Sequence, residues 1–298
     1  MHGGTEISRL LPHKHSYYRK RVDNLWDLDS LGISESEAKD VKNYPQPTWN
    51  EKEKRYEMKL LWNSDERPVT NLRSTRARTD KMTSNLGTKD FEEYDDHLAS
   101  LYQSSTIEYS PQHLDHSALY LPHRGIHRNG KLRVVFDGSA KDGSGKSLNS
   151  YLDPGHNLLS CLLHVILNFR SDHVGCQSDI KAAFHQILLP EEERRYVQFL
   201  WDDKILRFQR VPFGLSCSPF MLLHTISTHL RNYPGIDPRL RHLIDGGIYM
   251  DDLCLNFSSH EEAQTGMETV REVFAAAGME LHKIGKTLDI CQFTSYCK

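Results

Sequence analysis

The sequence has no large excess of charge of either sign. Its 37 Lys and Arg residues accompany 40 Asp and Glu residues, so the formal net charge of the 298-residue chain is −3. This balance excludes a protein that attracts polyanions through its overall charge, and any such site has to come from a local cluster. The stretch from 119 to 147 is one such cluster, with six basic residues against two acids: Arg124, Arg128, Lys131, Arg133, Lys141 and Lys146 with Asp137 and Asp142.

Paired cysteines and long apolar runs are missing as well. None of the six cysteines forms a Cys-x-x-Cys pair or a zinc-type Cys/His spacing, which favours free thiols in a reducing compartment. The longest apolar run, residues 158–167, contains Ser160, Cys161 and His164 and is too short to span a bilayer. The N-terminus shows no charged-then-apolar signal peptide. We therefore expect a cytoplasmic, intracellular protein with no membrane partner.

Polar and charged residues dominate the first third of the chain, and apolar runs alternate with turn residues beyond it. This change predicts two parts: residues 1–104, a partly irregular N-terminal extension, and residues 105–298, which hold the better hydrophobic core. Within the first part, apolar spacing predicts helices at 24–31 and 90–102 and a strand at 55–62.

The second part alternates between strand and helix patterns. Apolar runs bounded by turn residues predict strands at 131–137, 174–180, 196–201 and 205–211, and a hairpin within 248–256. Helical spacing predicts helices at 157–170, 218–233 and 259–277. Ser259 and Glu262 form a capping box for the last helix, and Gly278 follows its end. Hairpins mixed with helices indicate the α+β class, with an antiparallel sheet.

Three acids stand out against this pattern. Asp251 and Asp252 lie between two apolar strand runs, where the tip of a hairpin would expose both carboxylates. Asp179 lies near the end of an earlier strand, and an antiparallel sheet can place that strand end beside the hairpin tip. Such a group supplies the oxygen ligands that Mg²⁺ prefers, and two ions can activate a 3′-hydroxyl and stabilise a leaving pyrophosphate. Taken alone, the Asp-Asp pair is equally compatible with an ordinary turn, such as Asp202-Asp203.

Three segments, in this order, resemble the motifs of reverse transcriptases: Asp179–Phe184, Val211–Phe220 and Tyr249–Asp252. In that family an Asp is followed five residues later by Phe or Tyr, a Pro-x-Gly loop opens a helix, and an aromatic-x-Asp-Asp hairpin follows. The match covers roughly residues 105–290. It implies the fingers and palm of a right-hand polymerase, with an antiparallel palm sheet backed by helices and the thumb missing.

Further segments resemble the BEL/Pao class of long-terminal-repeat retrotransposons: Tyr120–Arg124, Lys131–Lys141, Ser147–Asn149 and the run from Leu25 to Tyr56. In such an element this piece belongs to a polyprotein, after a protease and before RNase H and integrase. The resemblance therefore implies that residues 1–104 are an extension typical of that polyprotein, and that the RNase H and integrase parts are its partners there.

The resemblance also implies a role for each acid. Asp179 and Asp251 would bind two Mg²⁺ ions, for which Mn²⁺ can substitute, with the Ile180 carbonyl helping to hold one of them. Asp252 would support the site and contact metal more weakly. Phe184 would be the steric gate that leaves no room for a 2′-hydroxyl and so selects deoxynucleotides. Ordinary core packing is the alternative for this Phe.

The remaining nucleotide-binding residues implied by the resemblance are Lys131, Arg133, Gly214, Tyr249 and Met250. Lys131 and Arg133 would grip the triphosphate, because an Arg side chain bonds phosphate oxygens bidentately. A solvated strand edge is the alternative for this pair. Gly214 would let the backbone pass close to nucleotide and template, and a plain loop glycine is its alternative.

Two further residues lie near the expected site. Gln186, two positions past Phe184, is expected to line the same pocket. Lys283 lies close to where the family places a lysine that protonates pyrophosphate. A surface lysine is the simpler explanation of that residue alone.

The resulting hypothesis is an RNA-directed DNA polymerase. It would copy an RNA or DNA template from a primer with deoxynucleoside triphosphates, by two-metal nucleotidyl transfer, as part of a retrotransposon polyprotein. Two alternatives stay open. A relic of such an element would keep the fold and bind nucleic acid without catalysis. A two-metal nuclease would also need clustered carboxylates, but neither Phe184 nor the loop at 212–219.

Overall fold

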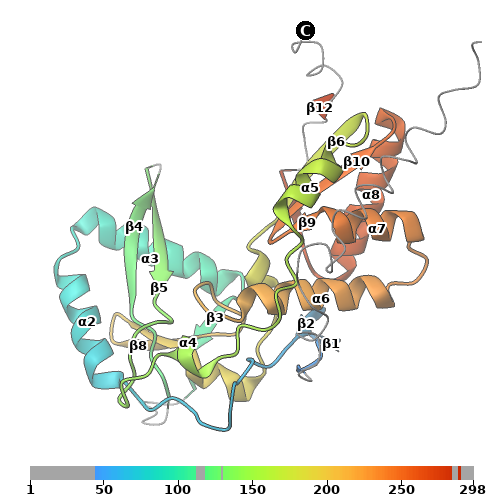
Figure 1. Cartoon of the computed structure of the whole chain (residues 1–298). Helices are drawn as coiled ribbons and strands as arrows, with labels where there is room; N and C mark the ends of the chain where they lie inside the picture. The colour runs from blue at the N-terminus through green and yellow to red at the C-terminus, as the bar shows by residue number, and fades with distance from the viewer. Residues whose placement is uncertain (1–43, 112–117, 129, 284–287, 290–298) are drawn as a thin grey trace, which may run out of the picture. The chain divides into compact units, whose positions relative to one another are not determined.

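The computed structural model describes residues 44–111, 118–128, 130–283 and 288–289. The chain divides into two units, of which the second, residues 45–298, holds nearly all of the described residues. The second unit mixes helices with antiparallel strands, which confirms the α+β class (Figure 1). The helix predicted at 24–31 lies outside the described residues.

The sheet that carries the acids is built around two long antiparallel strands, β6 and β10, with three short strands at its sides. Its members are β6 (Val174–Ile180), β10 (Asp252–Phe257), β9 (Ile248–Tyr249), β11 (Leu281–His282) and β12 (Leu288–Asp289). Strand β9 pairs with β10, whereas β11 and β12 pair with β6.

The two faces of this sheet differ in burial. Leu253, Leu255 and Phe257 alternate along β10 and are almost fully buried, because a strand points successive side chains to opposite faces. By the same alternation, Asp252 of β10 and Asp179 of β6 share the other face, where both are only partly buried. One face therefore anchors the sheet in the core and the other presents acids.

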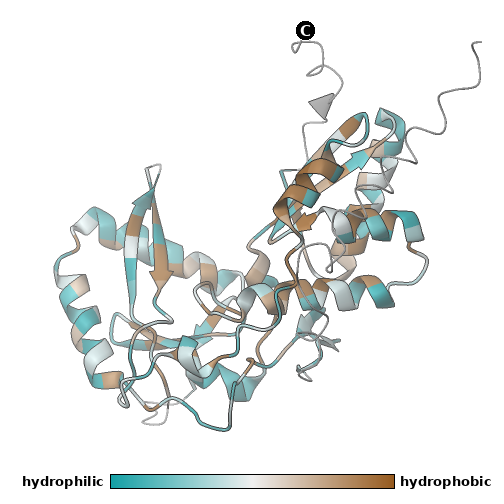
Figure 2. Cartoon of the chain, in the orientation of Figure 1, coloured by the Kyte–Doolittle hydropathy of each residue, from teal (hydrophilic) through white to brown (hydrophobic). Residues whose placement is uncertain are grey.

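Helices cover the sheet and supply the rest of this core. They are α5 (Leu162–Phe169), α7 (Pro238–Gly247), and α8 (His260–Ala276). Helices α5 and α7 contact β10, and α8 contacts β6, β10 and β11. Figure 2 shows hydrophobic residues concentrated on this sheet and on α5. Some of the apolar surface of α5 stays 40–51% exposed, at Leu162, Leu163, Ile166 and Leu167.

A second group of strands forms two further sheets. It comprises a three-stranded sheet of β3 (Ile107–Tyr109), β8 (Lys204–Phe208) and β7 (Gln198–Trp201), and a hairpin of β4 (His123–Arg128) and β5 (Lys131–Phe136). Helix α2 (Leu72–Ser84) contacts β7, and α3 (Thr88–Gln103) contacts β3 and β5. Aromatic rings join these elements: Tyr94 stacks on Trp201 with centroids 4.2 Å apart, and Phe136 meets Phe199 and Phe208 edge to face.

The remaining elements connect these two groups. They are the hairpin of β1 (Thr48–Asn50) and β2 (Arg55–Glu57), the short helices α4 (Leu148–Tyr151), η3 (Ala183–Gln186) and η4 (Glu191–Tyr196), and the largely buried helix α6 (Ser218–Asn232). Residues 45–104, assigned to an N-terminal extension from the sequence, are part of the same compact unit as the rest. The domain boundary at residue 104 stays a prediction.

Several predicted elements are shorter than expected, and helices α2, α4 and α7 were not predicted. The helix expected at 157–170 begins at Leu162, because the Asn157 side chain accepts the Leu159 N–H and holds the chain in a local turn instead. The strand expected at 55–62 ends at Glu57. Helix α7 was missed although Asp237-Pro238 marks its start: the Asp237 carboxylate accepts the Arg239 N–H at 2.8 Å. Helix α2, rich in Thr and Arg, was also missed.

We expect the free energy of unfolding to decrease as the pH falls from about 6.5 to about 4. His123 is 7% exposed, its Nε2 lies 2.8 Å from the Leu200 carbonyl oxygen, and its Nδ1 bonds to the Tyr94 hydroxyl. Burial lowers the pKa of His123 to about 4. Above pH 6.5 neither state binds this proton. Between the two values only the unfolded chain binds it, so stability is lost by up to roughly 3 kcal/mol.

Chemical denaturation at several pH values measures this loss. A variant with exposed His242→Gln should keep the wild-type pH slope, whereas His123→Gln should flatten it. A slope that is identical in wild type and His123→Gln would contradict the assignment.

Candidate active site

Strands β6 and β10 bring the three acids together. Asp252 pairs directly with Asp179 across the two strands, and the Ile180 N–H donates to the Asp251 carbonyl oxygen at 2.8 Å. Directly opposed residues in an antiparallel pair have Cβ atoms about 5 Å apart. The predicted neighbourhood of the first acid and the later hairpin is therefore confirmed.

The hairpin differs in one detail from the prediction. Strand β9 ends at Tyr249 and β10 begins at Asp252, so the turn consists of Met250 and Asp251. Of the two adjacent acids, only Asp251 is therefore at the tip of the hairpin. Met250 has a φ of 57°, a left-handed conformation that costs a non-glycine residue about 1 kcal/mol. This turn lets Asp251 leave the sheet while Asp252 stays in register opposite Asp179.

A pocket of about 410 Å³ lies at these acids, and Lys283 supplies its positive charge. The lining residues are Gln177, Ser178, Asp179, Asp251, Asp252 and Lys283. Lys283 Nζ lies 3.3 Å from Asp179 Oδ2. Burial, and then the nearby carboxylates of Asp251 and Asp179, raise the pKa of Asp252. The pocket therefore concentrates negative charge, which a cation would relieve.

Carboxylate oxygens at one sheet edge are the donors that Mg²⁺ and Mn²⁺ prefer, so the chemistry of the residues fits a divalent ion. In the part of the chain that the structure describes, however, no group of three or more Asp, Glu, His or Cys side chains is arranged as a metal site. Asp179, Asp251 and Asp252 thus share a pocket without forming a finished ligand cage.

Gln177 was not identified from the sequence and belongs to this pocket. It lies two residues before Asp179 on β6, so its side chain points to the same face of the sheet. The signal was present in the period of two along a strand already predicted there. Gln186, by contrast, was expected to line the pocket, but it is buried and its amide bonds to other protein groups.

Phe184 lies on η3, just after β6, and contacts the Pro-x-Gly loop. Its ring meets that of Phe213 edge to face, with centroids 4.9 Å apart. Phe184 is half-buried, and Phe213 is 47% exposed. The two motifs that contain these rings are therefore in contact at the surface, and Phe184 is not enclosed in the core.

Gly214 is held close to the end of β5. Its φ is +95°, and a Cβ built there would lie 2.9 Å from the Phe136 carbonyl oxygen. The Asn149 side chain donates to the Gly214 carbonyl oxygen at 2.9 Å and accepts the Ser216 N–H at 2.9 Å. A side chain here would push the loop off β5 whatever else it contacts. The approach of nucleotide to Gly214 stays a prediction.

Lys131 and Arg133 lie on one exposed face of the β4–β5 hairpin. In the pairing of this hairpin Lys131 stands opposite Arg128, and Arg124 lies further along the same face. Like charges directly opposed across strands are unfavourable, so this face fits an anion. Among the described residues, Lys131 and Arg133 have no ion-pair partner. Sequence reasoning found the basic stretch but not that the pairing places these four residues on one face.

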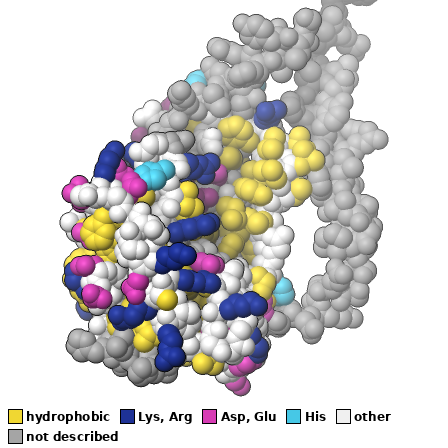
Figure 3. Space-filling view, turned by 90° about the vertical axis from the view of Figure 1, so that its left-hand side faces the viewer, with side chains coloured by type: hydrophobic (Ala, Val, Ile, Leu, Met, Phe, Trp, Pro, Cys, Tyr) yellow, Lys and Arg dark blue, Asp and Glu magenta, His cyan; other side chains and the backbone are white. Residues whose placement is uncertain are grey.

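Further Lys and Arg side chains lie on the side of the molecule where α2 is found. Figure 3 views the side on which α2 lies and shows dark-blue side chains following one another across it. Helix α2 contributes exposed basic residues, namely Arg73, Arg78 and Lys81.

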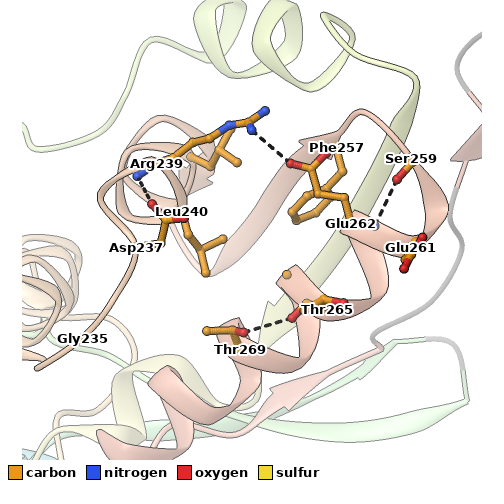
Figure 4. Close-up of a pocket in the computed structure, with 12 residues that line it drawn as sticks. Gly235, Asp237, Arg239, Leu240, Phe257, Ser259, Glu261, Glu262, Thr265 and Thr269 are labelled. Atoms are coloured by element: carbon orange, nitrogen blue, oxygen red, sulfur yellow. Dashed lines mark hydrogen bonds and ion pairs between the residues drawn. The ribbon is translucent and has the colours of Figure 1, made fainter.

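A second pocket, of about 570 Å³, lies between α7 and α8 and contains none of the predicted site residues (Figure 4). Arg239 Nη1 lies 3.4 Å from Glu262 Oε1 across it. The Asp237 and Ser259 side chains cap the two helices at its rim. The polar side chains of this pocket are therefore explained by their contacts with α7 and α8.

In the described ranges, no helix combines the length and the apolar character needed to cross a bilayer.

Comparisons with known proteins agree with this geometry. Residues 144–287 match the model of the family described as reverse transcriptase (RNA-dependent DNA polymerase). A stretch of 107 residues is 33% identical to the retrovirus-related Pol polyprotein from transposon 412 of Drosophila melanogaster, covering 35% of this chain and 8% of that protein.

Solved structures share the fold. The foamy viral protease-reverse transcriptase in complex with RNA/DNA hybrid aligns over 94% of this chain and 34% of its own, with a TM-score of 0.56 and 14% identity. The same enzyme in complex with dsDNA aligns over 93% and 52%, with a TM-score of 0.55 and 15% identity. The chain thus spans about a third of the first of these structures. Residues 144–287, which include all three acids, are thus similar to the reverse transcriptase family of RNA-dependent DNA polymerases.

Proposed function

We propose that this chain performs template-directed DNA synthesis by two-metal nucleotidyl transfer, on an RNA or DNA template. The observation that carries the proposal is the pairing of β6 with β10, which sets Asp179 opposite Asp252 with Asp251 in the adjacent turn. Only a few reactions need such a concentration of carboxylates, and phosphoryl transfer assisted by divalent ions is the one that the family performs.

Asp179 and Asp251 would hold two Mg²⁺ or Mn²⁺ ions, with the Ile180 carbonyl as a further ligand and Asp252 in support. When bound, the ions would lower the pKa of the primer 3′-hydroxyl and neutralise charge on the phosphates. The protein's own part is to hold the carboxylates close together. The Ile180 N–H to Asp251 carbonyl hydrogen bond supports this by fixing the turn against β6.

The hairpin face with Lys131 and Arg133 would bind the triphosphate of the incoming nucleotide. Fixed cations there would stabilise the charge that moves to the leaving group in the transition state. Phe184 would exclude a 2′-hydroxyl, and Gly214, Tyr249 and Met250 would line the nucleotide site. Lys283, already 3.3 Å from Asp179, would be close enough to pass a proton to pyrophosphate.

Primer and template would bind mainly through their phosphates. The foamy viral enzyme was solved with an RNA/DNA hybrid and with dsDNA, which supports a nucleic-acid duplex as the partner here. Affinity would then depend strongly on salt and little on sequence. The resemblance of residues 120–149 to BEL/Pao elements supports a place in the polyprotein of such a retrotransposon, acting in the cytoplasm beside RNase H and integrase parts.

We expect Asp179→Asn to lower primer extension by at least about a hundredfold, since divalent ions stabilise the transition state by several kcal/mol. Extension of a primed RNA template with deoxynucleotides and Mg²⁺ or Mn²⁺ measures this. The matched control is Asp202→Asn, in the β7–β8 turn, which should extend like wild type. Binding of primer-template without extension by the wild type would instead support the catalytically inactive relic.

Replacing Arg133 by Gln should raise the KM for deoxynucleotides about 10- to 100-fold, because a charge-assisted hydrogen bond contributes about 1.5–3 kcal/mol. The exposed Arg271 on α8 provides the control, and Arg271→Gln should leave this KM unchanged. Steady-state extension at varied nucleotide concentration separates the two variants. An equal KM in both would assign Arg133 to a merely solvated strand edge.

Phe184→Ala should reduce discrimination against ribonucleotides by at least about tenfold, since removing a wall of a shaped pocket removes a steric difference of that size. The measurement is the ratio of kcat/KM for deoxynucleotides and ribonucleotides. Loss of activity towards both sugars to the same extent would show that Phe184 supports packing and is not the gate.

A further inference from the structure

Arg55 joins two segments that lie beside the acids. Both segments are far from Arg55 in the sequence. Its Nη1 donates to the Gln186 Oε1 at 2.5 Å and to the Gly278 carbonyl oxygen at 2.6 Å. The three residues are contributed by β2, by η3 and by the turn after α8. Arg55 lies at the end of the run from Leu25 to Tyr56 that resembles BEL/Pao elements, but in none of the three reverse transcriptase motifs.

The first of these segments carries the candidate gate. Gln186 is buried and ends η3, the short helix that contains Phe184. Its Nε2 donates back to the Lys181 carbonyl oxygen, two residues after Asp179. Ala182, between them, has a φ of 46°, so the chain turns sharply here. The Gln186 side chain closes this turn from inside, and Arg55 holds the Gln186 side chain.

The second segment carries the lysine of the acidic pocket. Gly278 has a φ of 72°, and a Cβ there would lie 2.7 Å from the Lys54 carbonyl oxygen, so the β1–β2 turn rests against it. The chain then enters β11, where Leu281 pairs with Ile180, and reaches Lys283. This segment is also bonded to the first one, because the Lys181 N–H donates to the Glu280 carbonyl oxygen at 2.9 Å.

The backbone of β2 is anchored independently of Arg55. The Leu188 N–H donates to the Tyr56 carbonyl oxygen at 2.9 Å, and the Met58 N–H donates to the Leu188 carbonyl oxygen at 3.0 Å. The Tyr56 hydroxyl lies 3.1 Å from His229 Nδ1 on α6. Arg55 is therefore presented from a fixed strand. A guanidinium suits the task, since its planar donors are already oriented and lose little freedom on bonding two acceptors.

We propose that Arg55 is a positioning residue, which fixes η3 and β11 relative to each other and thereby sets Phe184 and Lys283 with respect to Asp179. The inference rests on the proposed polymerase function, because its effect on catalysis is felt through those three residues. Arg55 itself contacts neither nucleotide nor metal ligand. Its loss should let the gate segment and the lysine-bearing strand move apart while β6 and β10 stay paired.

The test compares Arg55→Gln with the matched variant Tyr56→Phe, which removes only the neighbouring hydrogen bond to His229. In Arg55→Gln, kcat/KM for deoxynucleotides should fall about 10- to 100-fold, as expected for misplaced reacting groups, and discrimination against ribonucleotides should weaken. Tyr56→Phe should lower Tm but keep the sugar selectivity of wild type. Arg55→Lys, which retains a charge and single-point donors, should be intermediate in selectivity.

A second readout does not depend on activity. Hydrogen exchange of the full chain should show reduced amide protection at 181–188 and 279–283 in Arg55→Gln, and unchanged protection in β10. Gln186→Met removes the acceptor with little change of size and should give the same pattern. The double variant should show less than the sum of the two single effects, because both substitutions break the Arg55–Gln186 hydrogen bond.

The outcomes separate the two ideas. Wild-type protein that extends no primer overturns the polymerase proposal, and the exchange pattern still decides whether Arg55 holds the two segments. Wild-type selectivity together with wild-type protection in both Arg55→Gln and Gln186→Met overturns the positioning role. A loss of selectivity in Tyr56→Phe equal to that in Arg55→Gln also overturns it, because general destabilisation would then explain both.

Discussion

The pairing of β6 with β10 is the interaction on which the site depends. It forces Asp252 opposite Asp179, an arrangement of like charges that is unfavourable by itself. Burial, together with the carboxylates of Asp251 and Asp179, raises the pKa of Asp252. The register is nevertheless fixed, because a slip by one residue would turn Leu253, Leu255 and Phe257 out of the core. Hydrophobic burial on one face therefore stabilises the register in spite of the electrostatic repulsion between the acids on the other face. The result is a pocket that favours cations.

A series of backbone and ring contacts connects this pocket with the cationic hairpin. The end of β5 at Phe136 lies against Gly214. Phe213, the residue before Gly214, packs on Phe184, which lies on η3 shortly after β6. Each step needs a particular residue type: a glycine that lets two backbones approach, and two aromatic rings that meet edge to face. The basic and the acidic parts of the site are thus joined through the Pro-x-Gly loop.

Much of this arrangement could be predicted from local patterns. Apolar runs bounded by turn residues identified the strand at 174–180, the hairpin at 248–256 and the acids that they carry, and the family motifs supplied their neighbours. What depends on distant contacts could not be predicted. Gln186 was expected to line the nucleotide pocket, yet its amide bonds to Arg55, 131 residues away. The shared face of Arg128 and Lys131 follows from a hairpin register, which a basic stretch alone does not determine.

Residues 45–104 support the site, although their composition resembles an irregular extension. Tyr94 of α3 stacks on Trp201 and contacts His123, so α3 supports the hairpin that carries Lys131 and Arg133. Arg55 of β2 bonds to Gln186 and to the Gly278 carbonyl oxygen, in the two segments beside the acids. Low hydrophobicity here does not mean independence, because a segment that adds one strand or one helix to an existing core needs few apolar residues of its own. A catalytic unit limited to the recognisable motifs would therefore lack contacts that hold those motifs in place.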